Sequence, residues 1–318
     1  MDRAAATLIA ALLALLAAAS LVWMFQGIGG GNRAFILQLR GTKLAGLVVV
    51  GAATGIATVL FQTVAANRVL TPSIMGFDAL YVLLQTAMIA ALGVAGFAAL
   101  PAGAKFLAEV AAMSLLAAAL FGTLLGRGAR DIPRTILTGV ILGVMFRSLS
   151  SFLARVMDPN AFATVQAASF ASFGSLDAAL LPVAGIIAGL CVAAALWLAP
   201  RLDVVALGRE PAISLGLRFD RLVLVTLGLV GMLVAVSTAL VGPVAFFGLL
   251  VAGLAHGLAP SARHAVLLPA AALIGAAILV TGQALFERLM GQAATLSVVV
   301  EFAGGLFFLF LLLKGRVR

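Results

Sequence analysis

The chain of 318 residues is 64% hydrophobic and only 10% charged, and it carries a formal net charge of +9. Soluble domains are about a quarter charged, so this composition excludes an ordinary soluble domain. Apolar runs of about 20 residues recur along the chain and predict an all-α polytopic membrane protein, whereas a β-barrel would show alternating segments of about ten residues. The net positive charge is not arranged in a basic stripe with aromatic residues, so no nucleic-acid partner is expected.

The apolar runs predict about ten transmembrane helices in a single domain that covers residues 1–318. The expected spans are Ala4–Phe25, Leu44–Ala66, Phe77–Leu100, Phe106–Gly126, Thr135–Leu153, Leu180–Leu198, Leu222–Val241, Val244–Ala255, Ala265–Phe286 and Thr295–Leu313. The segment 161–173 is too short and too polar to span, and it reads as a surface or re-entrant helix. The span 244–255 is also short, so the exact helix count around these two segments stays open.

The first two spans carry particular signals. The run from Ala4 is preceded by Asp2-Arg3 and could be a signal peptide, but it is long for the apolar core of one, which favours a retained helix. In the second span, Gly51 and Gly55 form a Gly-x-x-x-Gly pair, which predicts close packing against another helix.

Positive residues set the expected orientation. If both termini face the cytoplasm, 13 Lys and Arg residues fall in interior loops and 6 in exterior loops, with Arg147 inside a span. This bias follows the positive-inside rule. It predicts a multi-pass protein with both termini in the cytoplasm, and it places the charged segment 201–221 there too. That segment holds seven charged residues, which indicates that it leaves the membrane to meet a partner.

Reactive motifs are missing from the sequence. The only histidines are His256 and His264, no zinc, nucleophile-elbow or Walker A motif occurs, and Cys191 is the single cysteine. We therefore expect no catalytic residue, no metal site and no cofactor, and ATP hydrolysis, if it drives the protein, must occur on another chain.

Three acidic residues, Asp78, Glu109 and Glu301, lie within or at the ends of apolar runs. Such groups are costly in lipid and usually face a cavity or a partner. One interpretation is a proton relay, with Glu301 the best candidate to line a pathway. The simpler one is that each pairs with a nearby Arg or caps a helix, as Asp78 is placed to do at the start of its span.

Four collinear stretches between residues 35 and 313 resemble the FecCD family of permeases, the membrane subunits of ABC importers for iron-siderophore complexes, haem and vitamin B12. They include the loop Phe61–Asp78, the segment Ala206–Gly216 and Gly242-Pro-Val-Ala-Phe-Phe-Gly-Leu249. The chain departs from the wider family at Asn67-Arg68, where Asn-Pro is usual, and at Ala252-Gly253, where Pro-His is frequent. Both departures resemble the iron-chelate subgroup.

The resemblance implies a type II ABC importer permease fold and a single permease domain in the bacterial cytoplasmic (inner) membrane, with segment 201–221 coupled to cytosolic ATPase subunits. The resemblance implies two short helices around Pro211 in this coupling segment. The residues implied in this contact are Ala206, Leu207, Gly208, Arg209, Glu210, Ala212, Ser214, Leu215 and Gly216. Movement of the ATPase dimer would then open the pathway to each side in turn.

Exterior basic residues have an implied role as well. Arg40 and Lys43 match one family site for docking a periplasmic or lipoprotein substrate-binding protein, and Arg288 matches another. Lys43 stands where Arg is usual, which weakens a forked contact. A second permease, identical or related, and membrane lipid complete the expected partners. The expected cargo is ferric siderophore. The alternatives are a haem or vitamin B12 permease, an ion-coupled secondary transporter that uses the three acids, and a structural scaffold without transport.

Overall fold

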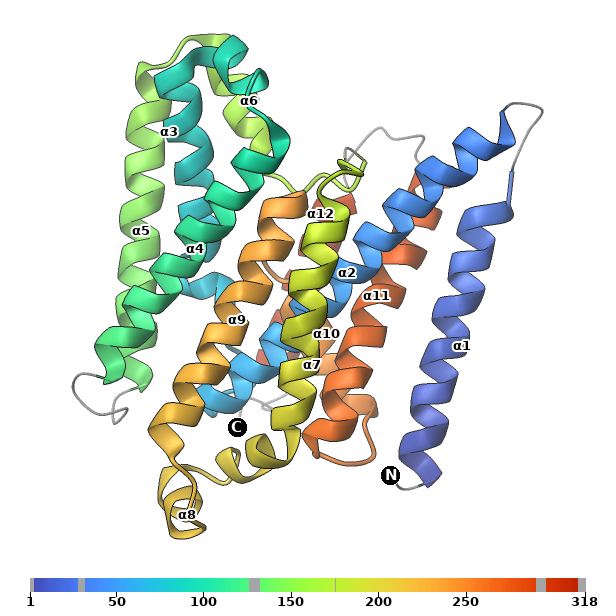
Figure 1. Ribbon diagram of the computed structural model, residues 1–318, viewed down its shortest axis with the longest axis vertical. Coiled ribbons are helices and arrows are strands. Elements are labelled where there is room, and N and C mark those ends of the chain that lie inside the picture. The colour runs from blue at the N-terminus through green and yellow to red at the C-terminus, as the bar shows by residue number, and fades with distance from the viewer. Residues whose placement is uncertain (1–2, 28–31, 126–131, 175, 290–295, 314–318) are drawn as a thin grey trace.

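The computed structural model describes residues 3–27, 32–125, 132–174, 176–289 and 296–313, and within these ranges the chain forms helices and no strand. Figure 1 shows them as one layered helical bundle. The helices are α1 Arg3–Phe25, α2 Arg33–Ala65, η1 Pro72–Met75 (a 3-10 turn), α3 Phe77–Ala98, α4 Ala102–Leu125, α5 Ile132–Val156, α6 Pro159–Ala168, α7 Leu181–Val205, α8 Arg209–Ser214, α9 Phe219–Val241, α10 Phe247–Leu258, α11 His264–Leu289 and α12 Leu296–Leu313.

Among the described residues, eight helices are long and apolar enough to cross a membrane. The two shorter apolar helices are α10 and α12. Together they match the ten spans expected from the sequence, and α6 is the short non-spanning helix predicted between the fifth and sixth spans. The chain is therefore an all-α multi-pass membrane protein.

The second and sixth spans are each extended at one end beyond the predicted bounds. The second begins at Arg33 instead of Leu44, because the Asn32 side chain caps it by accepting from the Phe35 N–H. The sixth continues past Leu198 and through Pro200 to Val205. At about 1.5 Å per residue, the 33 residues of α2 extend beyond the roughly 30 Å of bilayer hydrocarbon. Polar residues at both ends of these helices therefore stay helical outside the lipid.

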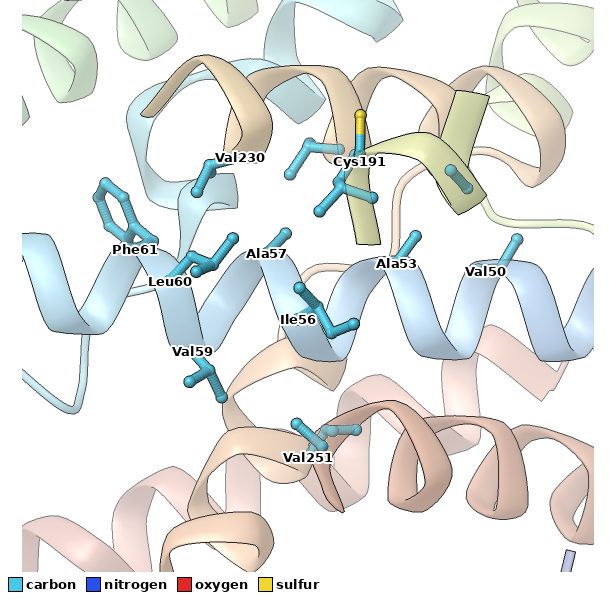
Figure 2. Packing of buried hydrophobic residues seen from close by; sticks show 14 of the residues in the cluster. Val50, Ala53, Ile56, Ala57, Val59, Leu60, Phe61, Cys191, Val230 and Val251 are labelled. Atoms are coloured by element: carbon cyan, nitrogen blue, oxygen red, sulfur yellow. The ribbon is translucent and has the colours of Figure 1, made fainter. Parts of the chain in front are cut away.

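α2 is the central helix: 67% of the residues in its most apolar 18-residue stretch are buried. It packs against α1, α7, α9, α10 and α11. Figure 2 shows Val50, Ala53, Ile56, Ala57 and Leu60 of α2 facing side chains that include Cys191, Val230 and Val251. The expected small-residue face is real: a Cβ on Gly51 would lie 2.6 Å from the backbone of Gly275, and one on Gly55 would lie 2.6 Å from the Ala271 carbonyl. Glycine is needed where α2 and α11 touch, because any side chain would hold the helices apart.

A second group of helices, α3 to α6, stands beside this centre and meets it mainly through α4 and α9 (Figure 1). Gly76, with a φ of +88°, starts α3, and its Cα faces Gly143 of α5. α6 and α8 lie at opposite ends of the molecule, and the N-terminal end of α1 lies at the same end as α8 (Figure 1). The two ends of the bundle are thus distinguished by one short helix each.

Candidate functional site

The candidate coupling segment, residues 201–221, forms one short helix instead of the two expected around Pro211. The first part of the segment continues α7 to Val205, and only Arg209–Ser214 makes a separate helix. Gly208 and Gly216 flank α8 with φ values of +98° and +83°, so each allows a sharp turn that other residues rarely make. These turns hold α8 away from the bundle, where it projects beyond the ends of α7 and α9 (Figure 1).

The residues implied in ATPase contact are not equivalent in the structure. Leu207, at 61% exposure, and Leu215, at 65%, are open, and so is Ile213, at 44%. Ala212 is fully buried and packs toward the bundle, so it supports α8 from behind. Ala206, Glu210, Ser214 and Gly216 are exposed, and Gly208 is partly buried. Ile213 was not among the residues implied by the resemblance, and the six-residue helix is too short for periodicity to reveal its exposed face.

Arg209 is engaged within the chain. Its Nη2 atom lies 3.2 and 3.3 Å from the two carboxylate oxygens of Asp220, in the first turn of α9. Both side chains are partly exposed. The contact ties the start of α8 to the start of α9, so Arg209 holds the position of α8 in addition to any contact with a partner.

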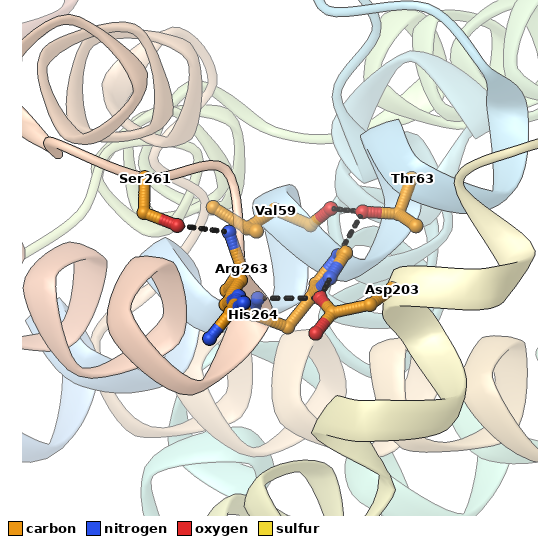
Figure 3. Close-up of polar contacts among 6 residues, drawn as sticks. All are labelled: Val59, Thr63, Asp203, Ser261, Arg263 and His264. Carbon is orange, nitrogen blue, oxygen red and sulfur yellow. Dashed lines mark hydrogen bonds and ion pairs between the residues drawn. The ribbon is translucent and has the colours of Figure 1, made fainter. Parts of the chain in front are cut away.

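A buried polar network lies where α7 enters the coupling segment (Figure 3). His264, 2% exposed, starts α11, and its Nδ1 atom lies 2.7 Å from Oδ1 of Asp203 in α7. The same oxygen accepts the His264 backbone N–H at 2.7 Å. On the other side of the ring, Nε2 lies 2.7 Å from the hydroxyl of Thr63 in α2, which also donates to the carbonyl of Val59. One imidazole therefore joins three helices.

Next to His264 is a cavity of about 220 Å³, and it lies at the loop of the first family motif. The loop is compact: Gln62 donates to the Arg68 carbonyl at 2.6 Å, and the Asn67 side chain accepts the Val69 N–H at 2.9 Å. Arg68 and His256 also line the cavity. The first motif and the start of the coupling segment are thus neighbours in space, although residues 79–200 separate them in the sequence.

The third motif marks the break between α9 and α10. Gly242, with a φ of +97°, ends α9, and Pro243 follows it. The Val241 carbonyl has a hydrogen-bond partner at this break, because it accepts the Ser172 N–H at 2.7 Å. Gly248 lies against Thr58 of α2, where a Cβ would collide with the threonine hydroxyl. The motif therefore makes the short helix α10 possible and lets it approach the central helix.

The basic residues implied in binding-protein docking lie at the opposite end of α2. Arg40 donates to the carbonyls of Trp23, Met24 and Gln26, so it caps the end of α1. Lys43 lies 3.3 Å from Glu287 of α11 and is 13% exposed. The side chain of Arg288 lies outside the described residues. Two of the three charges are thus engaged between helices, and a docking partner would have to share or displace these contacts.

The structure separates the three intramembrane acids into two places. Asp78 is in the first turn of α3, as expected, with Ser73 hydrogen-bonded to it and Arg147 and Glu301 within electrostatic range. Glu301 faces the backbone of Ala245. Ser73, Asp78 and Ala245 line a cavity of about 20 Å³ beside Gly242, enough for about one water molecule.

Glu109 is 2% exposed and lies apart from the other two acids. It accepts from Gln85 at 2.7 Å and lies 3.9 Å from Lys105, one turn earlier on α4. The partners of Glu109 are thus a glutamine and a lysine, in place of the arginine or helix end that the simpler interpretation named. Within the described residues, no group of three or more His, Cys, Asp or Glu side chains could hold a metal ion.

Comparison with known proteins agrees with this architecture. A family model of the FecCD transport family matches residues 4–314. The petrobactin import system permease protein YclO of Bacillus subtilis (strain 168) is 40% identical over 285 residues, covering 89% of this chain and 90% of that protein. The ferric enterobactin transport system permease protein FepD of Escherichia coli (strain K12) is 32% identical, covering 84% of this chain and 78% of that protein.

A solved structure described as an inward-facing conformation of a metal-chelate type ABC transporter superposes with a TM-score of 0.84. It covers 98% of this chain and 99% of that one at 23% sequence identity, so this likeness concerns the fold. The family match spans nearly the whole chain, including all the motifs whose geometry is described above. The chain belongs to the FecCD transport family.

Proposed function

We propose that this chain is the permease subunit of an ABC importer that moves a ferric siderophore across the cytoplasmic membrane. Energy comes from ATP hydrolysis on separate ATPase subunits, so the permease itself is not an enzyme. The relatives named above as petrobactin and ferric enterobactin permeases support this assignment. A siderophore is favoured over other chelates because the haem and vitamin B12 permeases that match are 28% and 29% identical, against 40% for the petrobactin permease.

The observation that carries the proposal is the exposed apolar surface at α8, made of Leu207, Ile213 and Leu215. α8 projects from the end of the bundle beyond the spans, so lipid acyl chains do not cover it (Figure 1). Its base is rigid, because Ala212 is buried and Arg209 is tied to Asp220. An exposed apolar surface on a fixed helix suits a groove on a cytosolic subunit. α8 can transmit movement because Ala212 and Arg209 hold it in place.

The remaining partners follow from the same assignment. A periplasmic or lipoprotein binding protein delivers the chelate at the end that carries α6, and a second permease, identical or related, completes the pathway. With α8 on the ATPase side, α1 begins in the cytoplasm, in agreement with the bias of positive residues. Arg40, Lys43 and Arg288 keep their proposed role near the binding protein, with the first two acting through the positions of α1, α2 and α11.

The test is uptake of radioactive iron as ferric petrobactin by cells that express the complete transport system. Ile213→Ser and Leu215→Ser together should abolish uptake and the co-purification of the ATPase, while the permease still reaches the membrane. Leu13→Ser is the control, since Leu13 is 50% exposed on α1, far from α8. Normal uptake with the double variant would refute the assignment of α8.

The same cells separate this function from an ion-coupled carrier. Collapse of the proton and sodium gradients with ATP held constant should leave uptake intact, whereas loss of the ATPase active site should stop it. Uptake that instead follows the gradients would identify a secondary transporter and give Asp78 and Glu301 a transport role.

A further inference from the structure

A groove of about 470 Å³ opens between α7 and α9, at the end of the bundle that carries α8. We call it the arginine groove, because three arginines line it. Its walls come from the end of α7, the start of α9 and the turn that follows α8. The residues used here are Trp197, Arg201, Arg218, Arg221, Leu222 and Val225.

Among the described residues, no acidic side chain neutralises the charge of the arginine groove. Arg201, Arg218 and Arg221 are exposed, and the described lining of the groove contains no acidic residue. In the ranges that the structure describes, none of these guanidinium groups takes part in an ion pair. The nearby Asp220 is engaged by Arg209 instead. The groove therefore presents three positive charges to whatever occupies it.

Trp197 positions one of these charges. Its indole is 69% exposed, and the guanidinium of Arg201 lies over its ring, with Cζ 4.4 Å from the ring centroid. A guanidinium that stacks on an aromatic face keeps its N–H edges free, and those edges match the oxygens of a phosphate. A tryptophan one turn inside an arginine is also typical of the boundary between lipid tails and headgroups.

Above the arginines, the exposed side of α7 is apolar, and α9 adds one exposed apolar side chain. On α7 the exposed residues Ile186 (64%), Leu190 (68%) and Trp197 recur at helical spacing and lead to Arg201. On α9, Val225 (44%) lies one turn from Arg221 on the exposed side. One apolar stripe on α7, with Val225 of α9 beside its end, thus leads to the cationic groups of the groove, as an acyl chain and its headgroup require.

We propose that the arginine groove binds an anionic phospholipid, with the phosphate among Arg201, Arg218 and Arg221 and an acyl chain along the apolar stripe of α7, beside Val225 of α9. Basic pockets between transmembrane helices on the cytoplasmic side suit such headgroups. Free phosphate would leave the apolar stripe of α7 without a role. The site does not depend on the cargo. Because Leu217 belongs to the groove and follows α8, the lipid also steadies the coupling segment.

The experiment uses the purified transporter with its ATPase subunits, in nanodiscs that contain phosphatidylglycerol at increasing fractions in phosphatidylcholine. Native mass spectrometry counts the phosphatidylglycerol molecules retained on release. Each single Arg→Gln change at 201, 218 or 221 should weaken retention about 5-fold, and the triple change about 100-fold, from the usual contribution of one basic residue near an anionic surface. Arg3→Gln is the matched control, since Arg3 is exposed at the same end on α1.

Two further arms make the outcome decisive. Triple Arg→Lys replacement keeps the charge and removes the forked contacts, so it should fold and retain lipid between wild type and the Gln variant. Inorganic phosphate at the lipid's own concentration should not compete; full competition would show a phosphate site and overturn the lipid assignment. Unchanged lipid retention in the triple Gln variant would also overturn it. So would a triple Gln variant that loses the ATPase subunits but keeps the lipid.

Discussion

His264 and Asp203 form a buried pair, with Nδ1 of the imidazole 2.7 Å from the carboxylate oxygen, and this pair fastens α11 to α7 three residues before Ala206. Thr63 holds the other side of the ring and so adds the central helix α2 to the joint. Because Asp203 lies in the part of the coupling segment that continues α7, this imidazole is one link through which a force on α8 can reach α2 and α11.

Removal of the carboxylate should loosen the joint. Asp203→Ala deprives both the Nδ1 atom and the backbone N–H of His264 of their acceptor. We expect the free energy of unfolding to fall by about 1–3 kcal/mol. We also expect more ATP to be hydrolysed for each chelate imported, since ATPase movement is transmitted less well. Thermal unfolding and the ratio of ATP hydrolysis to chelate uptake in proteoliposomes measure the two effects.

Ser261→Ala, at the exposed turn before α11, is the control. An unchanged ratio in Asp203→Ala would argue against the joint.

The pair Arg209–Asp220 can be tested by exchange. Arg209→Glu should reduce uptake because two acidic groups then face each other at the base of α8, and Asp220→Arg should do the same with two cations. The double exchange restores the attraction and should recover most of the uptake. The stability effect should stay below about 1 kcal/mol, since both groups are partly exposed. If the double variant is as inactive as Arg209→Glu, then Arg209 acts by touching the ATPase, not by holding α8.

The contact of Gly51 with Gly275 should not tolerate a methyl group. Gly51→Ala places a Cβ 2.6 Å from the backbone of α11, so the two helices must separate. Overpacking of this kind costs about 1–3 kcal/mol. Gly189→Ala in α7 is the matched control, because nothing lies within 4 Å of its Cβ position. The thermal midpoint in detergent distinguishes them, and equal midpoints would mean that α2 and α11 are not in close contact.

Arg40 should affect α1 before it affects the binding protein. Arg40→Gln removes a cation from three carbonyls at the end of α1, so this end should loosen from α2. A cysteine pair introduced at the facing ends of α1 and α2 should then cross-link more slowly than in the parent. Arg33→Gln serves for comparison, since Arg33 is exposed at the start of α2. Weaker binding-protein affinity with unchanged cross-linking would instead indicate direct docking through Arg40.

Glu109 should be replaceable by its amide. Glu109→Gln keeps the side-chain volume and can still hydrogen-bond Gln85, so uptake should remain above about half of the parent value. The measurement is uptake as a function of the proton gradient, with the variant and the parent each in membrane vesicles. A complete loss of uptake with normal protein abundance would show that the carboxylate takes part in transport.

The order of the spans, the membrane class and the family follow from the linear sequence, because each depends on local composition. A run of about 20 apolar residues has to be helical in lipid, wherever it packs. Gly51 and Gly55 likewise predict a close helix contact, since small residues at this spacing let two helix backbones approach in many proteins. The helix ends were less well predicted: α2 begins at Arg33 and α7 ends at Val205, because capping and helical continuity outweigh the change in hydropathy.

What each polar side chain does was decided by residues far away in the sequence. Arg40 and Lys43 look free in the sequence, but the end of α1 and Glu287 of α11 engage them. His264 gave no signal as a lone histidine, and only folding places Asp203 and Thr63 on either side of it. Lipid solubility is a property of a segment and can be read from it, whereas a hydrogen bond or an ion pair needs two partners at a few ångströms, and only the tertiary structure brings them there.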